Sequence, residues 1–424
     1  MTNIKKILDL LQIKQIYLIF LFFSLIISIF YSYHLTIRFP NLIDDNYNLV
    51  VKNIPFAYGD LIHNLIYNNE YSTDIWGFKM YLSRLPILPF LIYILYQISA
   101  NIYFIVIMKN LFFFSIFFSA AYFFIKSNKI NIKFFILLIV IFFYNPYNLI
   151  VFSSFLYADF LTAILVPCLF LTILSSYRIR WLVFSILIFI LYLSKTNMFF
   201  LAFFLSLIFY MLEKSNKKII PLISLIIAIS IWGTFGYLKT GKFPFAQSLI
   251  TINSWGMSHV LNKEFKNYYP YKSVDQINFE DKNKAFSDEW QFYNFYNNKN
   301  KKYLNDNKIE YLKDIKIKLK FIFIDFYASA SETYSNDGSK KIRFSNIPNK
   351  IFFNISLIIF LVSFIKSIKN RKFSKIDIYF IFFVMSYIFP LLIGWATCKH
   401  LIGIFLVSKI YLIFKFCKKY KYIN

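Results

Sequence analysis

The residues best suited to chemistry in this sequence are acids that lie between its first long apolar stretch and the next. The segment from Asn41 to Ala100 contains Asp44, Asp45, Asp60, Glu70 and Asp74. A carboxylate in such a position can act as a general base that takes a proton from a nucleophile. Asp60 is the strongest candidate, because it opens the apolar stretch LIHNLI, which would hold it near a membrane surface. Any one of these acids also fits an ordinary solvated loop residue.

Several basic residues are placed where they could bind an anion. Arg84 precedes Leu85 and Pro86, and either anchors a short helix at the membrane interface or binds a specific anion. Lys195 separates two apolar stretches with almost no loop between them. Lys399 and His400 begin the last apolar stretch, where the positive end of a helix dipole disfavours cations unless an anion such as phosphate binds there. A pair of plain interfacial residues is the alternative for Lys399 and His400.

Asp159 lies in the sequence SSFLYADF, at the beginning of an apolar stretch. A carboxylate at that depth in a membrane is costly and is commonly functional. We expect Asp159 and Lys195 to matter together only if the fold brings them together. The histidines have no partner at metal-ligand spacing, and the cysteines are too few and dispersed for a disulfide framework or a zinc site; these residues are His34, His63, His259, Cys168, Cys398 and Cys417.

The composition indicates that these residues are positioned by membrane helices. Of the 424 residues 58% are hydrophobic and 22% aromatic, and repeated apolar stretches near 20 residues are typical of transmembrane helices. The formal charge of +26 is carried mostly by short basic clusters beside the apolar stretches. Cytoplasmic loops show this bias, so we expect no nucleic-acid partner. The predicted fold is an all-α polytopic membrane protein.

The charge rule predicts about ten membrane-spanning segments with both termini in the cytoplasm. Residues 86–98 are apolar but short and contain Pro86 and Pro89, so we expect an interfacial or re-entrant helix there. The predicted spans are residues 16–32, 101–126, 134–150, 157–175, a broken pair over 181–213, and 219–237, 350–365, 376–394 and 401–416.

This topology divides the chain into three parts. Residues 1–237 form an N-terminal transmembrane module whose first outer loop, 39–100, carries the acids, and whose first span is a retained anchor. The polar residues 238–349 form a large extracytoplasmic loop region, in which residues 315–330 could lie on the membrane surface. Residues 350–424 form the C-terminal transmembrane helices.

Five segments, in this order, resemble motifs of the GT-C glycosyltransferases, specifically the bacterial relatives of protein O-mannosyltransferases and of the lipid A aminoarabinose transferase. YGDLIHNLIYNNEYS with SRLPILPFLIYILYQIS resembles that family's first outer loop, and NPYNLIVFSSFLYAD resembles its second. LYLSKTNM resembles a Leu-Thr-Arg-Pro motif with Lys195 in place of Arg. LKTGKFPFAQSLITINSWG and CKHLIGIFL resemble two later motifs. The family's usual acid would fall at residues 54–57, so either it has moved to Asp60 or Asp44 or Asp45 takes its place.

The resemblance implies a GT-C-like bundle that transfers a sugar from a polyprenyl-phosphate donor to a glycan, lipid or protein acceptor. The expected location is a bacterial inner membrane, with the active site on the outer face. Asp60 would be the general base of an inverting transfer, and Asp159 would position the acceptor or a cation. The donor phosphate would be bound by Arg84, Lys195, Lys399 and His400. No cofactor is required. The resemblance is compatible with a divalent metal, but the spacing of candidate metal ligands in this sequence does not require one.

Two other functions remain open. A polysaccharide polymerase of the O-antigen type also has many spans and a large outer loop. A non-enzymatic flippase or transporter of lipid-linked sugars would use the basic outer residues as a path for lipid phosphates.

Overall fold

The computed structural model describes most of the predicted spans and both long loop regions in part. The described residues are 13–38, 40–54, 58–74, 77–128, 130, 136–137, 140, 158–251, 286–325, 346–394 and 398–419. Within these ranges every element with assigned bounds is a helix, and β-pairing is limited to three isolated bridges. The all-α prediction is confirmed for this part of the chain.

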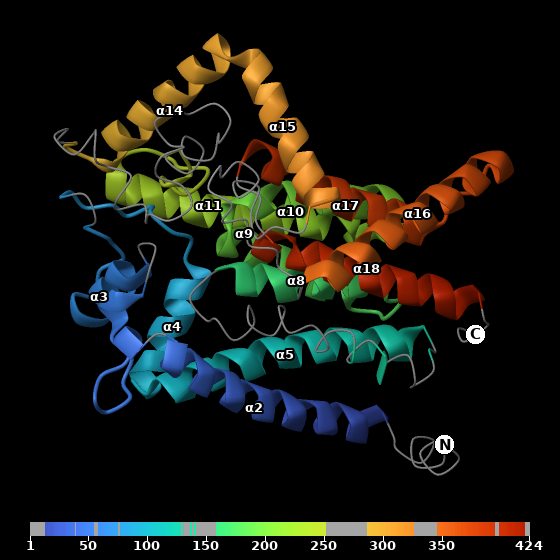
Figure 1. Ribbon diagram of the computed structural model, residues 1–424, viewed down its shortest axis with the longest axis horizontal. Helices are drawn as coiled ribbons and strands as arrows, with labels where there is room; N and C mark the ends of the chain where they lie inside the picture. The colour runs from blue at the N-terminus through green and yellow to red at the C-terminus, as the bar shows by residue number, and fades with distance from the viewer. Residues whose placement is uncertain are drawn as a thin grey trace.

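The long helices lie side by side in one bundle (Figure 1). Their bounds agree with the predicted spans to within several residues, except that the predicted span 134–150 lies mostly outside the described residues. These helices are α2 (Ile13–Arg38), α5 (Ile102–Ser127), α8 (Ala158–Leu174), α9 (Arg180–Ser194), α10 (Phe199–Leu212), α11 (Ile220–Thr240), α16 (Ile347–Asn370), α17 (Lys375–Ile393) and α18 (Cys398–Lys419).

Four helical stretches within the described residues are long and apolar enough to cross a membrane. They are Ile102–Ser127, Asn216–Thr240, Ile347–Asn370 and Lys375–Ile393, and shorter apolar helices include Asp159–Leu174 and Arg180–Ser194. The chain is therefore an α-helical membrane protein, while the full number of about ten crossings stays a prediction.

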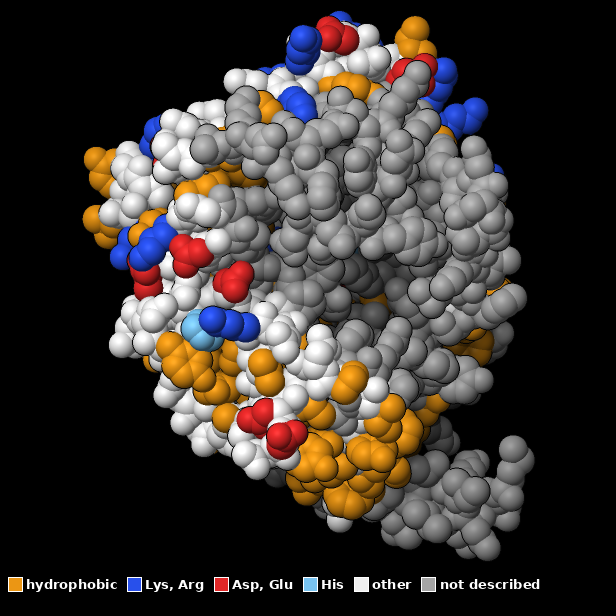
Figure 2. Space-filling view, turned by 60° about the vertical axis from the view of Figure 1, so that its left-hand side comes forward, with side chains coloured by type: hydrophobic (Ala, Val, Ile, Leu, Met, Phe, Trp, Pro, Cys, Tyr) orange, Lys and Arg blue, Asp and Glu red, His pale blue; other side chains and the backbone are white. Residues whose placement is uncertain are grey.

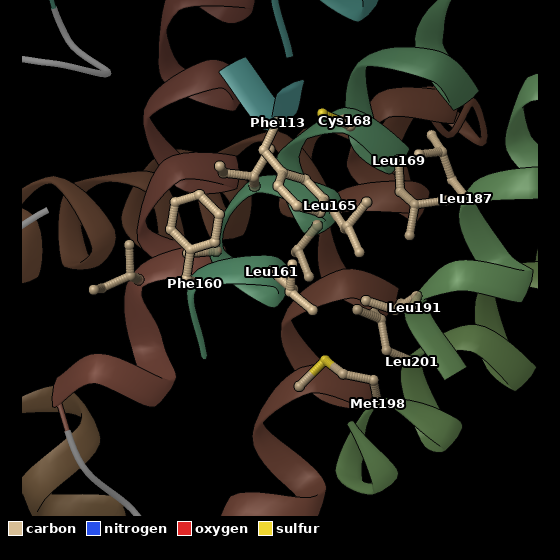
Figure 3. Close-up of a cluster of buried hydrophobic side chains, with 14 of the residues drawn as sticks. Phe113, Phe160, Leu161, Leu165, Cys168, Leu169, Leu187, Leu191, Met198 and Leu201 are labelled. Atoms are coloured by element: carbon tan, nitrogen blue, oxygen red, sulfur yellow. The ribbon is translucent and has the colours of Figure 1, made fainter. Parts of the chain in front are cut away.

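Helix α8 forms the centre of the bundle. It packs against α5, α9 and α18, and residues 159–173 are buried on every side. Figure 3 shows Leu161, Leu165 and Leu169 of α8 among side chains of α5, α9 and the start of α10. Because lipid tails are as apolar as leucine, close packing and not transfer from water holds such helices together. Helices α11 and α16, by contrast, leave Ile226 and Ile358 about 60% exposed, as expected of surfaces that face hydrocarbon.

The first loop folds as a helical layer on one end of the bundle. After two short 3-10 turns, Pro40–Leu42 and Val51–Asn53, it forms α3 (Tyr58–Tyr67) and α4 (Ile87–Ile98). Asn101 then caps α5, accepting hydrogen bonds from the backbone N–H groups of Tyr103 (3.0 Å) and Phe104 (3.3 Å). The predicted short helix is thus confirmed as separate from the span after it, and its interfacial location stays a prediction.

Two helices of the polar region meet at an angle and form an inverted V that projects from the bundle (Figure 1). They are α14 (Glu289–Asp306) and α15 (Lys308–Phe323). The end of α15 is tied to α17, because buried Lys318 donates a hydrogen bond to the carbonyl of Leu392 at 3.1 Å. Residues 326–330 of the predicted surface stretch lie outside the described residues.

We call the end of the bundle that carries this first loop the loop end. Helices α5, α8 and α18 begin there, and α9 and α11 end there (Figure 1). The opposite end, where α5 and α16 end and α9 begins, we call the basic end, because it gathers Lys126, Arg178, Arg180, Lys217, Lys218, Lys366, Lys369 and Lys372.

Candidate active site at the loop end

Three of the predicted site residues meet at one carboxylate oxygen. Lys195 donates a hydrogen bond from its ammonium to Oδ1 of Asp159, and Nε2 of His400 lies 3.4 Å from the same oxygen. The side chains of Asp159, Lys195 and His400 are 7%, 18% and 11% exposed. These residues lie far apart in the sequence, and the fold brings them together. The condition under which we expect Asp159 and Lys195 to matter together is therefore met.

The local backbone explains how each of the three side chains reaches this point. Asp159 lies in the first turn of α8, where the positive end of the helix dipole favours a carboxylate. Lys195 has an extended backbone (φ −160°, ψ 126°) between the end of α9 and the 3-10 turn Thr196–Met198. His400 lies in the first turn of α18. All three therefore come from helix ends and not from the apolar middle of the bundle.

Gly403 lets α18 approach α8 closely one turn after His400. A Cβ at this position would lie 3.0 Å from Oη of Tyr387, 3.2 Å from the carbonyl of Thr162 and 3.2 Å from Cβ of Val166. The hydroxyl of Tyr387 in turn donates to the carbonyl of His400 at 2.6 Å. A Cβ here would have to push these neighbours aside, so a glycine suits the close approach of α18 to α8, and the hydrogen bond ties the start of α18 to α17.

Arg84 connects the first loop to this group. It is 9% exposed, and its guanidinium carbon lies 5.1 Å from the centre of the Tyr58 ring. Burial lowers the pKa of Arg84, whereas Tyr58, Tyr71 and Asp159 act to raise it. Burial also raises the pKa of Tyr58, and Asp159 adds to that shift. A buried guanidinium does not fit the alternative of an arginine that reaches from an interfacial helix into water.

We refer to Asp159, Lys195, His400 and Arg84 as the site cluster. It combines one carboxylate with an ammonium, a guanidinium and an imidazole, in surroundings that largely exclude water. Such a group can bind an anion strongly, because hydrogen bonds and charge interactions gain strength where the local dielectric is low. An incoming phosphate would compete with Asp159 for the ammonium of Lys195.

The backbone just before Arg84 is held by an acid that the sequence did not single out. Glu289, the first residue of α14, accepts hydrogen bonds from the N–H groups of Tyr81 and Leu82, each at 2.9 Å. It is 2% exposed, and burial raises its pKa although these hydrogen bonds act in the opposite direction. Tyr71 adds a hydrogen bond of 2.8 Å to the carbonyl of Arg84. The polar region thus helps to place Arg84.

Asp60, the predicted catalytic acid, lies half-buried in the first turn of α3. It follows Gly59, where a Cβ would lie 2.5 Å from the carbonyl oxygen of Ile54, so the chain enters α3 in close contact with the preceding turn. Tyr58, two residues before Asp60, provides the ring beside Arg84. The structure therefore places Asp60 on the helix that borders the site cluster, and its catalytic role stays a prediction.

The two alternative acids lie on the outer surface of the first loop. Asp44 accepts hydrogen bonds from the backbone N–H groups of Asn46 (2.9 Å) and Asn48 (2.8 Å), and the bond from Asn48 is the largest cause of its lowered pKa. It therefore stabilises a turn. Asp45 is exposed.

The other acids of the loop have partners within it. Lys79 forms a salt bridge with Glu70 at 2.8 Å, and Asn64 donates to Asp74 at 3.3 Å. Figure 2 shows that charged side chains of both signs are scattered over this face of the molecule, above an apolar surface. Their arrangement fits the solvated-loop interpretation.

Two further predictions concern ligands, namely phosphate binding by Lys399 and a divalent metal that is allowed but not required. The side chain of Lys399 lies outside the described residues, although its backbone begins α18. Within the described ranges, no group of three His, Cys, Asp or Glu side chains is placed to hold a metal ion.

No family model, no curated protein and no solved structure matches this chain. The chemistry of the site is therefore argued from the residues themselves. Tyr58, Tyr71, Glu289 and Gly403 are the residues of the site that sequence reasoning missed. Only Glu289 had a local signal, since Asp288 before it caps α14 by accepting hydrogen bonds from Trp290 (2.7 Å) and Gln291 (2.9 Å).

Proposed function

We propose that this protein is a glycosyltransferase that moves a sugar from a polyprenyl-phosphate donor to an acceptor on the extracytoplasmic side of the membrane. The observation that carries the proposal is the site cluster. Residues from α8, from the break after α9 and from the start of α18 meet at the loop end. Arg84 of the first loop lies within the electrostatic influence of Asp159. A lipid-linked donor would place its phosphate at the membrane interface, where buried cations could bind it.

The cations of the site cluster suit the leaving phosphate. When the bond between the anomeric carbon and the phosphate oxygen breaks, negative charge grows on the phosphate. The planar guanidinium of Arg84 and the ammonium of Lys195 would stabilise that charge together with His400, and the same role for Lys399 stays a prediction from the sequence. Asp159 would hold Lys195 and His400 in place before the donor arrives, which is a positioning role.

Aromatic side chains beside Arg84 suit the isoprenoid tail of the donor. The ring of Tyr71 stacks on that of Phe90 of α4, with centroids 5.6 Å apart, and meets Phe235 of α11 edge-on at the same distance. Phe90 is 43% exposed. An apolar surface that begins next to a buried guanidinium matches a ligand whose phosphate ends an apolar chain.

The transfer step follows from these roles. Asp60 takes the proton of the acceptor hydroxyl while that oxygen attacks the anomeric carbon from the side opposite the phosphate. The new carbon–oxygen bond forms as the bond to the phosphate breaks, so the sugar is inverted and polyprenyl phosphate leaves with the bonding electrons. The proton on Asp60 then passes to water.

Substitution of Asp60 tests the assignment in purified protein reconstituted with polyprenyl-phosphate sugars. Asp60→Asn should slow transfer roughly 100-fold or more while donor binding is kept, because general-base catalysis contributes about that much. Asp44→Asn is the matched control, since Asp44 stabilises a turn on the same loop, and it should transfer at the wild-type rate. Transfer by Asp60→Asn at the wild-type rate would remove Asp60 from the mechanism.

Mass spectrometry of surface glycans and glycolipids, from cells with and without the protein, tests the activity itself. We expect a glycan or glycolipid that loses one sugar when the protein is absent. An unchanged profile contradicts glycosyl transfer. Movement of lipid-linked sugar across liposomes containing the purified protein, with no covalent product, would identify a flippase instead.

A further inference from the structure

A second polar site lies at the basic end, on the far side of the bundle from the site cluster. It is a pocket of about 240 Å³ between the turn that joins α8 to α9 and the turn that joins α10 to α11. Its charged and aromatic lining includes Arg178, Arg180, Trp181, Glu213, Lys217 and Lys218. We refer to it as the basic pocket.

The basic pocket has an excess of positive charge on a fixed frame. Four of its side chains are cationic and Glu213 is its acid. Arg180 is held by a salt bridge to Glu213 and by a hydrogen bond of 2.6 Å to the carbonyl of Ser175. That pair joins the start of α9 to the end of α10, and it leaves the charges of Arg178, Lys217 and Lys218 to attract an anion.

The two lysines are placed by aromatic rings. Nζ of Lys217 lies 4.6 Å from the ring centre of Trp181, and Nζ of Lys218 lies 4.5 Å from that of Tyr210. Such contacts reduce the freedom of long side chains before a ligand binds, which lowers the entropy lost on binding.

Exposed apolar side chains continue from the pocket along the bundle. Four such side chains are each more than 40% exposed, namely Ile179 and Leu182 at the start of α9 and Ile219 and Ile223 at the start of α11. In a membrane protein these surfaces face hydrocarbon. A ligand with a phosphate in the pocket could therefore lay acyl chains along α9 and α11.

We propose that the basic pocket binds the phosphate of an anionic membrane phospholipid. The inference does not depend on glycosyl transfer, because it rests on a separate group of residues at the opposite end of the bundle. The free inorganic ion shares the phosphate chemistry, but it would leave the adjoining apolar surface unused.

Native mass spectrometry of the purified full chain tests the proposal with phosphatidylglycerol and phosphatidylcholine of equal chain length. Wild-type protein should retain phosphatidylglycerol in preference. The triple variant Arg178→Gln, Lys217→Gln, Lys218→Gln keeps the Arg180–Glu213 salt bridge. It should bind phosphatidylglycerol on the order of 100-fold more weakly, from the contribution of each cation at a lipid surface.

A control variant removes the same charge elsewhere on the same end. Lys366→Gln, Lys369→Gln, Lys372→Gln changes exposed residues of α16 and the turn after it. Its affinity for phosphatidylglycerol should stay within a few-fold of wild type. Equal losses in the two triple variants would mean a general surface attraction and would overturn the proposal.

Two further measurements keep the test decisive. The single variant Lys217→Gln disturbs the fold least and should weaken phosphatidylglycerol binding about fivefold; unchanged binding by both pocket variants would refute the site. Inorganic phosphate should displace the lipid only weakly. Binding of inorganic phosphate as tightly as phosphatidylglycerol would show a free-anion site and overturn the lipid assignment.

Discussion

At the scale of single residues, the salt bridge between Lys195 and Asp159 is the most demanding feature of the site. Both side chains are largely buried. Removing charges from water is costly, and their mutual attraction compensates only when both partners are present. A buried pair with His400 beside it is therefore weak evidence for stability as such, and the proposed function gives it a role, because an incoming phosphate would compete for Lys195.

The replacement Lys195→Met tests this pair. It leaves Asp159 buried without its main cation, so we expect a loss of roughly 3–5 kcal/mol in the free energy of unfolding, with His400 offsetting a part. Thermal and denaturant unfolding in detergent measure it. Lys79→Met, in an exposed pair with Glu70, is the control and should cost under about 1 kcal/mol.

The double variant Asp159→Asn, Lys195→Met separates stability from function. It should recover most of the lost stability, since neither charge then remains uncompensated, but donor binding should stay weak. Donor binding as tight as in wild type would show that Lys195 does not contact the phosphate.

At the scale of elements, the polar region and the first loop are coupled through Glu289. Its carboxylate accepts hydrogen bonds from the backbone of Tyr81 and Leu82, which lie 208 and 207 positions earlier in the chain, just before Arg84. The same stretch is also held by the N–H of Ser248, which donates to the carbonyl of Leu82 at 2.8 Å. Helix α14 thus acts as a support for the first loop.

The replacement Glu289→Ala should loosen that support. The N–H groups of Tyr81 and Leu82 lose their acceptor, which costs about 1–3 kcal/mol locally. We expect faster amide hydrogen exchange in residues 79–86 and weaker donor binding. Glu310→Ala, an exposed acid on α15, is the control and should change neither. Unaltered exchange in residues 79–86 of Glu289→Ala would show that α14 does not hold the loop.

At the scale of the whole molecule, the directions of the helices separate two chemically different ends. The loop end holds the site cluster, and the basic end holds the basic pocket and many exposed lysines. The bias of cytoplasmic loops toward Lys and Arg predicts that the basic end faces the cytoplasm. The proposed transfer on the outer face of the membrane would require this orientation.

Labelling of single cysteines tests the orientation. In protein lacking Cys168, Cys398 and Cys417, a membrane-impermeant maleimide added to intact cells should modify Lys52→Cys, which lies at the loop end. Lys369→Cys, at the basic end, should react only after the membrane is opened. Labelling of both positions from the same side would contradict the topology, and the reverse pattern would exclude an outward-facing site.

The sequence by itself determined the local features of the protein, which depend only on short stretches of residues. Apolar runs located the long helices, the prolines and shortness of residues 86–98 indicated a separate helix, and the polar break at Lys195 divided α9 from α10. Hydropathy and helix breaking depend on neighbouring residues, so no tertiary information was needed. The same reasoning marked Asp159, Lys195 and Arg84 as unusual, because each is a charge placed beside apolar sequence.

The tertiary structure decided which of these residues meet. Lys195 and His400 share one oxygen of Asp159 because of the way α8, α9 and α18 pack. Gly403 contributes to that packing, since it has no Cβ and lets Tyr387 and Thr162 lie against it. Glu289 reaches the first loop across most of the chain. Contacts of this kind are set by the positions of whole helices, and no local pattern of residues encodes them.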